Sequence, residues 1–279
     1  MAKISAHRSE ERRRTLGGVY IQRASVRHLL KHGFEVVSSA NRNRLAIEAL
    51  ASEGLVEVAN PAEVGARSEI VMTIVVDQEQ TETVLRGANG VLSRLRPGST
   101  VIVMSTIDPG YCQALAAEAA AHDIAVLDCP VSGQRPRAVE GTLSLMTGGD
   151  AAVIEHCREA LEVLGTIFHC GGVGMGMVAK LANNGLSYGV GAMLIEVRAM
   201  ARAHGMDLDL LMEIFKQSSG DSYVVQNWEA MRPGIQHLMR LGEKDVGLWV
   251  EAAQRQGTPA TMLGAWQSFD WSSLLPEDV

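Results

Sequence analysis

The stretch GGVGMGMVAKLANN, residues 171–184, stands where the character of the chain changes. It follows a short apolar run, 166–170, and begins a long helical pattern. A strand, a glycine turn and a helix are a common seat for a dinucleotide's pyrophosphate, because the free N–H groups of a helix N-terminus bind phosphate. Such a fingerprint should lead, about 20 residues later, to a second strand ending in an acid that binds ribose. The pattern instead stays helical as far as Gly205, which favours a helix that joins two domains.

Before this stretch, short apolar runs alternate with helical patterns, which is typical of a sheet covered by helices. The expected strands lie at 35–37, 70–76, 100–104, 124–127 and 143–146. Three of these runs are almost continuously apolar, as strands buried on both faces must be. Residues 1–170 are therefore predicted to form a Rossmann-like domain with a doubly wound, mostly parallel sheet.

After Cys170 the strand patterns end, and only helical patterns follow. The expected helices lie at 174–204, 207–217, 222–232, 239–256 and 259–270. Through Ile195 the only charge in the first of them is Lys180, and a helix that is apolar all round is expected to be buried all round. Residues 171–279 are therefore predicted to form an all-helical domain that follows a long interdomain helix.

The composition narrows the class of protein. A length of 279 residues and a hydrophobic content of 47% suit two globular domains, and a net charge of -7 argues against a general nucleic-acid binder. The four cysteines show no zinc-type spacing and are expected to be reduced thiols, so no metal site is predicted. No apolar run approaches the roughly 20 residues of a membrane span, and no secretory pattern follows Met1. We expect a cytoplasmic protein that binds neither nucleic acid nor membranes.

Lys180 is the unusual residue of the long helix. It shares one helix face with Asn184, four residues later, and a buried lysine without a nearby acid is costly and has a lowered pKa. A lysine whose ammonium reaches the surface is one interpretation, and a functional site is the other.

Three segments resemble the β-hydroxyacid dehydrogenases when they are taken together: DCPVSGQRPRAVEGTLSLMTGGD (128–150), GMVAKLANN (176–184) and EKD (243–245). The resemblance runs from about residue 27 to 256. It implies an NAD(P)-dependent enzyme that transfers a hydride between the nicotinamide and a small β-hydroxyacid or its semialdehyde, the substrate being a small carboxylate.

The resemblance also implies roles for individual residues. Lys180 matches the family's general acid and base, and Asn184 matches the residue that orients the substrate. Ser132 and Gly133 match the turn whose hydroxyl and backbone N–H bind the substrate carboxylate. A plain turn after a strand is the alternative interpretation of Ser132 and Gly133.

Other matches concern the cofactor, NAD or NADP. They comprise the residues that follow two of the expected strands and a second lysine: Val75, Val76, Gln80, Thr106 and Lys244. A solvated surface run is the alternative interpretation of the segment that contains Lys244. Asn41 and Arg42 follow the first expected strand, at the position where an acidic residue would bind the ribose of NAD. An arginine there suits the 2′-phosphate of NADP.

The N-terminus departs from the family. Of the three expected glycines only Gly17 is present, since Val19 and Gln22 occupy the other two positions. The polar run RSEERRRT, residues 8–15, cannot form a buried central strand. Residues 5–25 therefore suggest either foreign sequence and a sheet without its central strand, or an altered cofactor site.

Two other functions remain open at this point. An imine-reductase-like relative is one, although such enzymes typically replace the lysine that Lys180 retains. A non-catalytic relative with a defective cofactor site is the other. In each case the helical domain is expected to form a homodimer or homotetramer, because it carries more apolar surface than its own helices can bury.

Overall fold

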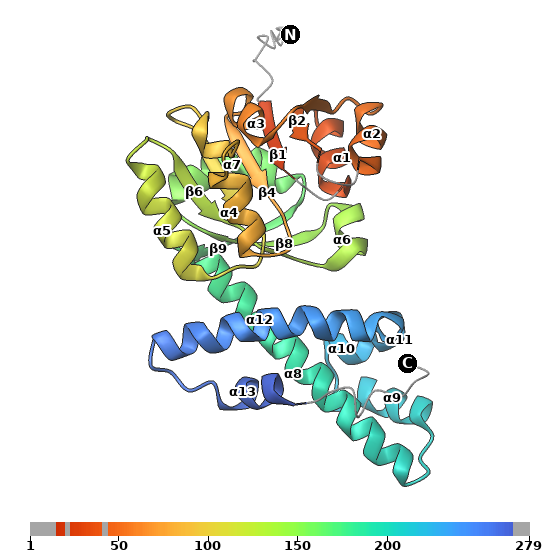
Figure 1. The fold of residues 1–279 in the computed structure, drawn as a ribbon. Helices are drawn as coiled ribbons and strands as arrows, with labels where there is room; N and C mark the ends of the chain where they lie inside the picture. Colours follow the sequence, from red (N-terminus) through yellow and green to blue (C-terminus); the bar gives the residue numbers. More distant parts are fainter. Residues whose placement is uncertain (1–14, 20–22, 41–43, 270–279) are drawn as a thin grey trace, which may run out of the picture. The chain divides into compact units, whose positions relative to one another are not determined.

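The computed structural model describes residues 15–19, 23–40 and 44–269. The chain divides into two compact units, Met1–Met177 and Val178–Val279. The first unit holds a sheet with helices and the second is helical (Figure 1), so the predicted fold class is confirmed. Among the described residues, no helix combines the length and the apolar character needed to cross a membrane.

Within the described parts of the chain the sheet contains nine strands, in the order β3-β2-β1-β4-β5-β6-β8-β7, with β9 paired to β8. The strands from β1 to β6 run parallel, whereas β8 is antiparallel to β6 and β7. Their bounds are β1 Thr15–Val19, β2 Glu35–Ser39, β3 Val56–Val58, β4 Ile70–Thr73, β5 Thr100–Val103, β6 Ala125–Asp128, β7 Val131–Ser132, β8 Leu143–Gly148 and β9 Gly165–Gly171.

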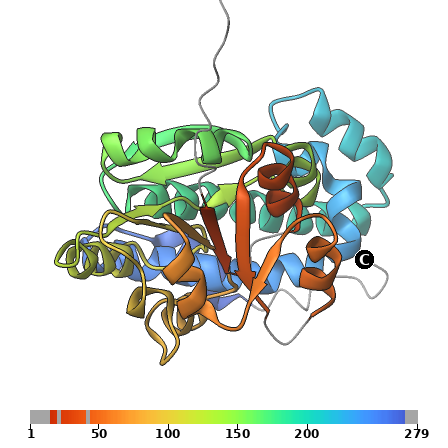
Figure 2. The same cartoon turned by 90° about the horizontal axis from the view of Figure 1, so that it is seen from above.

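One expectation about the sheet is wrong, because the central strand is present. Strand β1 lies between β2 and β4, and its Gly17 is in register with Val37 on one side and Val71 on the other. Figure 2 shows β1 beside β2 from above. The strand starts at Thr15, the last residue of the polar run. Its two glycines contribute no apolar side chains, so the sequence shows no strand pattern there. Gly17 consequently lies inside the strand and not in the turn that follows it.

Helices cover both faces of the sheet. They are α1 Arg23–Lys31, α2 Leu45–Ala51, α3 Pro61–Arg67, α4 Gln78–Arg86, α5 Pro109–Ala120, α6 Gln134–Glu140 and α7 Ala151–Glu162, with a short 3₁₀ helix at Val91–Ser93. Alternate residues of β4 enter different cores: Met72 belongs to one cluster and Val71 to the other. Each core is apolar, which explains why the central strands are continuously apolar in sequence.

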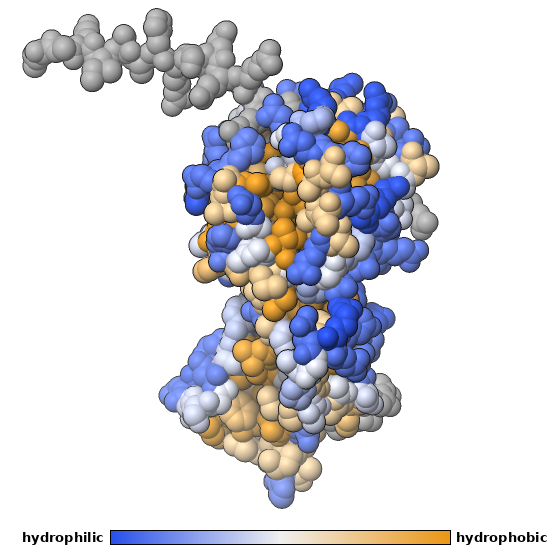
Figure 3. All heavy atoms as spheres, turned by 90° about the vertical axis from the view of Figure 1, so that its left-hand side faces the viewer, coloured by the Kyte–Doolittle hydropathy of each residue, from blue (hydrophilic) through white to orange (hydrophobic). Residues whose placement is uncertain are grey.

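The second unit is built on the long helix α8, Met175–Ala203. The helices after it are α9 Leu208–Lys216, α10 Tyr223–Gln226, α11 Trp228–Met231, α12 Ile235–Arg255 and α13 Thr261–Ser268, with a 3₁₀ turn at Arg232–Gly234. The predicted helix at 222–232 is thus two short helices. The expectation that α8 is buried all round is also wrong, because Leu186 is 72% exposed, Met193 54% and Met200 58%. Figure 3 shows hydrophobic side chains at the surface of the helical unit.

The glycine run before α8 binds a carboxylate of the chain itself. Asp128, fully buried at the end of β6, accepts the backbone N–H of Gly174 at 2.6 Å and that of Met177 at 2.7 Å. Burial raises the pKa of this carboxyl, and the N–H donors oppose the rise. The first turn of α8 is therefore occupied by Asp128, as a helix N-terminus favours an anion.

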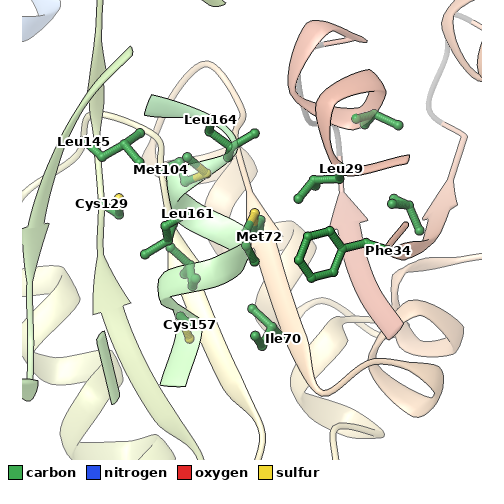
Figure 4. Close-up of a cluster of buried hydrophobic side chains, with 14 of the residues drawn as sticks. Leu29, Phe34, Ile70, Met72, Met104, Cys129, Leu145, Cys157, Leu161 and Leu164 are labelled. Atoms are coloured by element: carbon green, nitrogen blue, oxygen red, sulfur yellow. The ribbon is translucent and has the colours of Figure 1, made fainter. Parts of the chain in front are cut away.

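The close approach of α8 to the sheet depends on Gly176. A Cβ there would overlap the carbonyl oxygen of Met146 and lie 2.8 Å from that of Asp128. Both obstacles are backbone atoms, which move little in a packed core. Figure 4 shows one of the two hydrophobic cores of the first unit, with Met104, Cys129 and Leu161 among the labelled side chains.

We expect Gly176→Ala to lower the free energy of unfolding by about 1–3 kcal/mol, because the added methyl overpacks the contact of α8 with β6 and β8. Gly172→Ala is the matched control, since no atom lies within 4 Å of its Cβ position, and it should change stability by less than about 0.5 kcal/mol. Urea denaturation followed by tryptophan fluorescence measures both variants. Equal stability of the two would contradict this account of the glycine run.

Candidate active site

Lys180 lies near the start of α8, on a half-buried face of the helix. Burial lowers its pKa to about 8, the carboxylate of Asp245 works in the opposite direction, and the ammonium of Lys244 adds to the lowering. At neutral pH this amine is therefore close to the point at which it can both give and accept a proton. The interpretation of Lys180 as a simple surface lysine does not explain this environment.

Asp245 organises the residues around Lys180. Its Oδ2 accepts a hydrogen bond from Nδ2 of Asn184 at 2.7 Å, and its Oδ1 lies 2.9 Å from Nζ of Lys244 in an ion pair. Asp245 and Asn184 are both buried, so solvent weakens the hydrogen bond between them little, whereas the Lys244 side chain is 30% exposed. The structure thus brings together three predicted residues of the second unit: Lys180, Asn184 and Lys244.

A small residue allows α12 to carry Asp245 this close to α8. A Cβ on Gly242 would lie 2.9 Å from Cη2 of Trp266 and 3.0 Å from Cδ1 of Tyr188. The centroids of the Tyr188 and Trp266 rings lie 6.0 Å apart, and α12 packs against both rings at Gly242. Asp245 follows Gly242 by three residues and so lies on the same buried face of α12.

Ser132 and Gly133 lie in the first unit, where β7 ends and α6 begins. Gly133 has φ +134 and Gln134 has φ +55, so the chain turns sharply here. A side chain at Gly133 would come 2.7 Å from Cβ of Arg137, so the turn requires a glycine for space as well as for backbone angle. Ser132 is half-buried and in register with Ser144 of β8.

The predicted cofactor residues follow the carboxyl ends of β4 and β5. The N–H of Val75 donates to Oγ of Ser105 at 2.8 Å, and Val76 is 62% exposed. The backbone N–H of Gln80 donates to the Asp77 carboxylate, which caps α4. Thr106 is half-buried just after β5. In an open α/β sheet the ligand crevice lies at these strand ends, where the strand order reverses, and here the order reverses between β1 and β4.

Two buried hydroxyls fit a polar ligand at this edge. Ser39 ends β2 and Thr73 ends β4, and both are in register with Val19, the last residue of β1. Neither hydroxyl has a hydrogen-bond partner among the described residues. Unpartnered buried hydroxyls are uncommon and suit a place where a ligand or its bound water lies. The described part of the edge therefore fits a dinucleotide.

Some predicted residues cannot be placed. Asn41 and Arg42 lie outside the described residues, and so does Gln22 in the segment after β1. The contacts of Ser132 and Gly133 given above lie within the first unit, and those of Lys180, Asn184 and Lys244 lie within the second.

A hollow of about 450 Å³ lies at the opposite, amino ends of β5 and β6, bordered by Ser99, Asp123 and His156. That position is remote from the strand ends that hold the predicted cofactor residues. It does not belong to the candidate site.

Sequence reasoning gave Asp245 no role of its own, although a pattern for it existed. Met239, Gly242 and Val246 form the buried stripe of α12, and Asp245 falls within that stripe. An acid on an apolar helix face implies a partner, because a buried charge must be paired. Ser144 was missed for a different reason, since only the register of β7 with β8 places it beside Ser132.

Comparisons with known proteins agree with this geometry. Residues 23–174 match the NAD binding domain of 6-phosphogluconate dehydrogenase, and residues 174–270 match the family described as NAD-binding of NADP-dependent 3-hydroxyisobutyrate dehydrogenase. The L-threonate dehydrogenase of Cupriavidus necator is 31% identical, over 85% of this chain and 82% of its own. A probable mitochondrial 3-hydroxyisobutyrate dehydrogenase of Dictyostelium discoideum is 33% identical, over 83% of this chain and 76% of its own.

Among solved structures, the 3-hydroxyisobutyrate dehydrogenase of Mycobacterium tuberculosis with L-serine has a TM-score of 0.80 and covers 94% of this chain and 98% of its own. At 24% identity this likeness shows the fold alone. The family matches and the curated relatives carry the assignment: the chain belongs to the β-hydroxyacid dehydrogenases, NAD(P)-dependent oxidoreductases that act on CH–OH groups.

Proposed function

We propose that this enzyme interconverts a small β-hydroxyacid and its semialdehyde or oxo acid, with Lys180 as the general acid and base. The observation that carries the proposal is the pKa of Lys180, lowered by burial to about 8 within the Asn184–Asp245–Lys244 network. We retain residues 1–170 as the cofactor-binding domain and 171–279 as the helical domain.

The proton step follows from this environment. An ordinary lysine with a pKa near 10.4 is almost wholly protonated at neutral pH and cannot act as a base. With a pKa of about 8, Nζ of Lys180 takes the hydroxyl proton during oxidation and returns it to the carbonyl oxygen during reduction. The nicotinamide, when bound, supplies the hydride chemistry.

Asn184 is held in one orientation for its proposed role. Its Nδ2 donates to Asp245, and its Oδ1 accepts a hydrogen bond from Nδ2 of Asn183 at 3.1 Å. One N–H of the Asn184 amide then remains for the substrate oxygen that exchanges its proton with Lys180. We propose that Ser132 and Gly133 bind the substrate carboxylate through the hydroxyl and a backbone N–H.

For the cofactor we propose Lys244 together with residues of the first unit. They are Gly17 inside β1, Val75, Val76 and Gln80 after β4, and Thr106 after β5. Asn41 and Arg42 would meet the adenosine ribose, and the arginine favours the additional phosphate of NADP.

The alternatives predict different results. An imine-reductase-like activity is disfavoured by the lysine at position 180 and by relatives whose names give hydroxyacids as their substrates. A non-catalytic relative would show no binding when NADPH or NADH is titrated and nicotinamide fluorescence is followed. The cytoplasm remains our prediction for the compartment, although several relatives are named as mitochondrial.

Lys180→Ala should lower kcat by about 10²–10⁴-fold, because the proton-transfer group is lost while the fold is retained. Lys216→Ala, which removes an exposed lysine at the end of α9, is the control and should retain full activity. Steady-state rates followed by nicotinamide absorbance measure both variants. A Lys180→Ala enzyme with more than about half of the wild-type kcat would refute the assignment.

The pH profile tests the same residue independently. Oxidation needs the neutral amine and should accelerate as pH rises through about 8, whereas reduction needs the ammonium and should slow over the same range. Asp245→Asn removes the carboxylate that raises the pKa of Lys180. The rise of the oxidation rate and the fall of the reduction rate should therefore both occur at lower pH. Asp209→Asn, at an exposed position of α9, should leave the profile unchanged. A profile of Asp245→Asn that is unmoved or moves to higher pH rules out this electrostatic link.

We also propose that the helical unit forms a homodimer or homotetramer. Leu186, Met193, Val197 and Met200 are exposed and repeat at spacings that place them on one face of α8. A continuous apolar stripe of this kind usually marks a protein interface.

Light scattering should therefore give at least twice the chain mass of 30.0 kDa. Replacing both Met193 and Met200 by Asp should produce monomers, because a buried interface does not tolerate unpaired charges. Val139→Asp, at an exposed position of the first unit, is the control and should not alter the mass. A wild-type monomer at micromolar concentration would show that the stripe is not an interface.

A further inference from the structure

An arginine lies beside the turn that is proposed to bind the substrate carboxylate. Ser132 and Ser144 are opposite each other in the antiparallel pair of β7 with β8. Opposite residues of such a pair extend on the same face of the sheet, with Cβ atoms about 4.5–5.5 Å apart. Nη1 of Arg137 donates to Oγ of Ser144 at 3.3 Å. Ser144 thus lies beside Ser132 on the sheet and also accepts a hydrogen bond from the guanidinium of Arg137.

Packing holds Arg137 in this position. Its Cβ and Cδ occupy the space that a side chain at Gly133 would need, at 2.7 and 3.0 Å from the Cβ position there. Gln134 has φ +55, a strained conformation for a residue other than glycine, and it allows α6 to start immediately after the turn. The aliphatic part of the Arg137 side chain thus packs against Gly133, in the turn that is proposed to bind the substrate carboxylate.

The charge of Arg137 has no carboxylate partner within the described parts of the chain. None of the ion pairs found there includes this residue, although it is half-buried. A guanidinium has five N–H donors, and the hydrogen bond to Ser144 uses one of them. A partly buried arginine with free donors suits an anion from outside the chain, since its planar fork binds carboxylate, sulfonate or phosphonate in a bidentate manner.

We propose that Arg137 is a specificity-determining residue that binds a second anionic group of the substrate. This inference rests on the proposed function, in which Ser132 and Gly133 bind the first carboxylate. Because Ser144 lies between Ser132 and the guanidinium, Arg137 reaches a group further along the substrate and not the same carboxylate. The enzyme then prefers small β-hydroxyacids with two anionic groups to those with one.

The experiment compares two matched acids, 2-(hydroxymethyl)glutarate as the diacid and 3-hydroxyisobutyrate as the monoacid. The wild-type enzyme should have a kcat/KM at least about tenfold higher for the diacid. Arg137→Gln should remove that preference, chiefly through KM, and leave the monoacid within about twofold. Arg137→Lys, which retains the charge without the planar fork, should give an intermediate preference.

Arg135→Gln is the matched control, because Arg135 is exposed on the same short helix and carries the same charge. It should leave both acids unchanged. If Arg137→Gln and Arg135→Gln behave alike, or if Arg137→Gln weakens both acids equally, Arg137 has no role in selection and the inference is overturned.

A binding assay separates this inference from the proposed function. Calorimetry with 2-methylglutarate and isobutyrate, which lack the reacting hydroxyl, measures recognition without turnover. If neither hydroxyacid is oxidised but 2-methylglutarate binds more tightly than isobutyrate and loses that advantage in Arg137→Gln, the proposed function fails and the role of Arg137 stands. If both hydroxyacids are oxidised but the diacid has no advantage in rate or binding, the function stands and the role of Arg137 falls.

Discussion

The start of the long helix α8 depends on the hydrogen bonds that it makes to the buried carboxylate of Asp128. Asp128 ends β6 and accepts the N–H groups of Gly174 and Met177, so the first turn of α8 is tied to the middle of the sheet. Glycines at 148 and 176 make room for it, since a Cβ at either position would collide with this carboxylate or its neighbours. Lys180 lies three residues after Met177 on the same helix.

A second buried carboxylate organises the helical unit. Asp245 contacts Asn184 and Lys244 directly, and its charge opposes the fall that burial imposes on the pKa of Lys180. The balance is useful for catalysis, because burial alone would reduce the ammonium form that reduction requires. Each unit thus contains one buried carboxylate with defined partners. Asp128 accepts hydrogen bonds from backbone N–H groups, whereas Asp245 contacts the side chains of Asn184 and Lys244.

The turn after Ser132 places a required glycine next to an arginine. Gly133 satisfies backbone geometry and packing, whereas the next residue, Gln134, adopts a conformation that glycine would adopt more readily. Arg137 fills the space that Gly133 leaves and has donors to spare.

The sequence by itself determined the fold class and the long helix, and it singled out Lys180, which we propose as the general acid and base. Continuously apolar runs require a sheet covered on both faces, and a lone lysine with an asparagine four residues later stands out on an apolar helix. Such patterns are local, so they can be recognised without knowing what packs against them. Strands β1 and β7 were not predicted because they lack a local pattern. Strand β1 contains two glycines, and β7 has only two residues.

Only the tertiary structure decided which groups meet. The glycine run resembles a phosphate site in sequence, yet its N–H groups bind Asp128, 46 residues earlier for Gly174 and 49 for Met177. The partner of Asn184 lies 61 residues away, and Ser144 comes beside Ser132 through strand register. Hydrogen bonds and pKa values depend on distance in space and on burial, and neither quantity is contained in the spacing of residues along the chain.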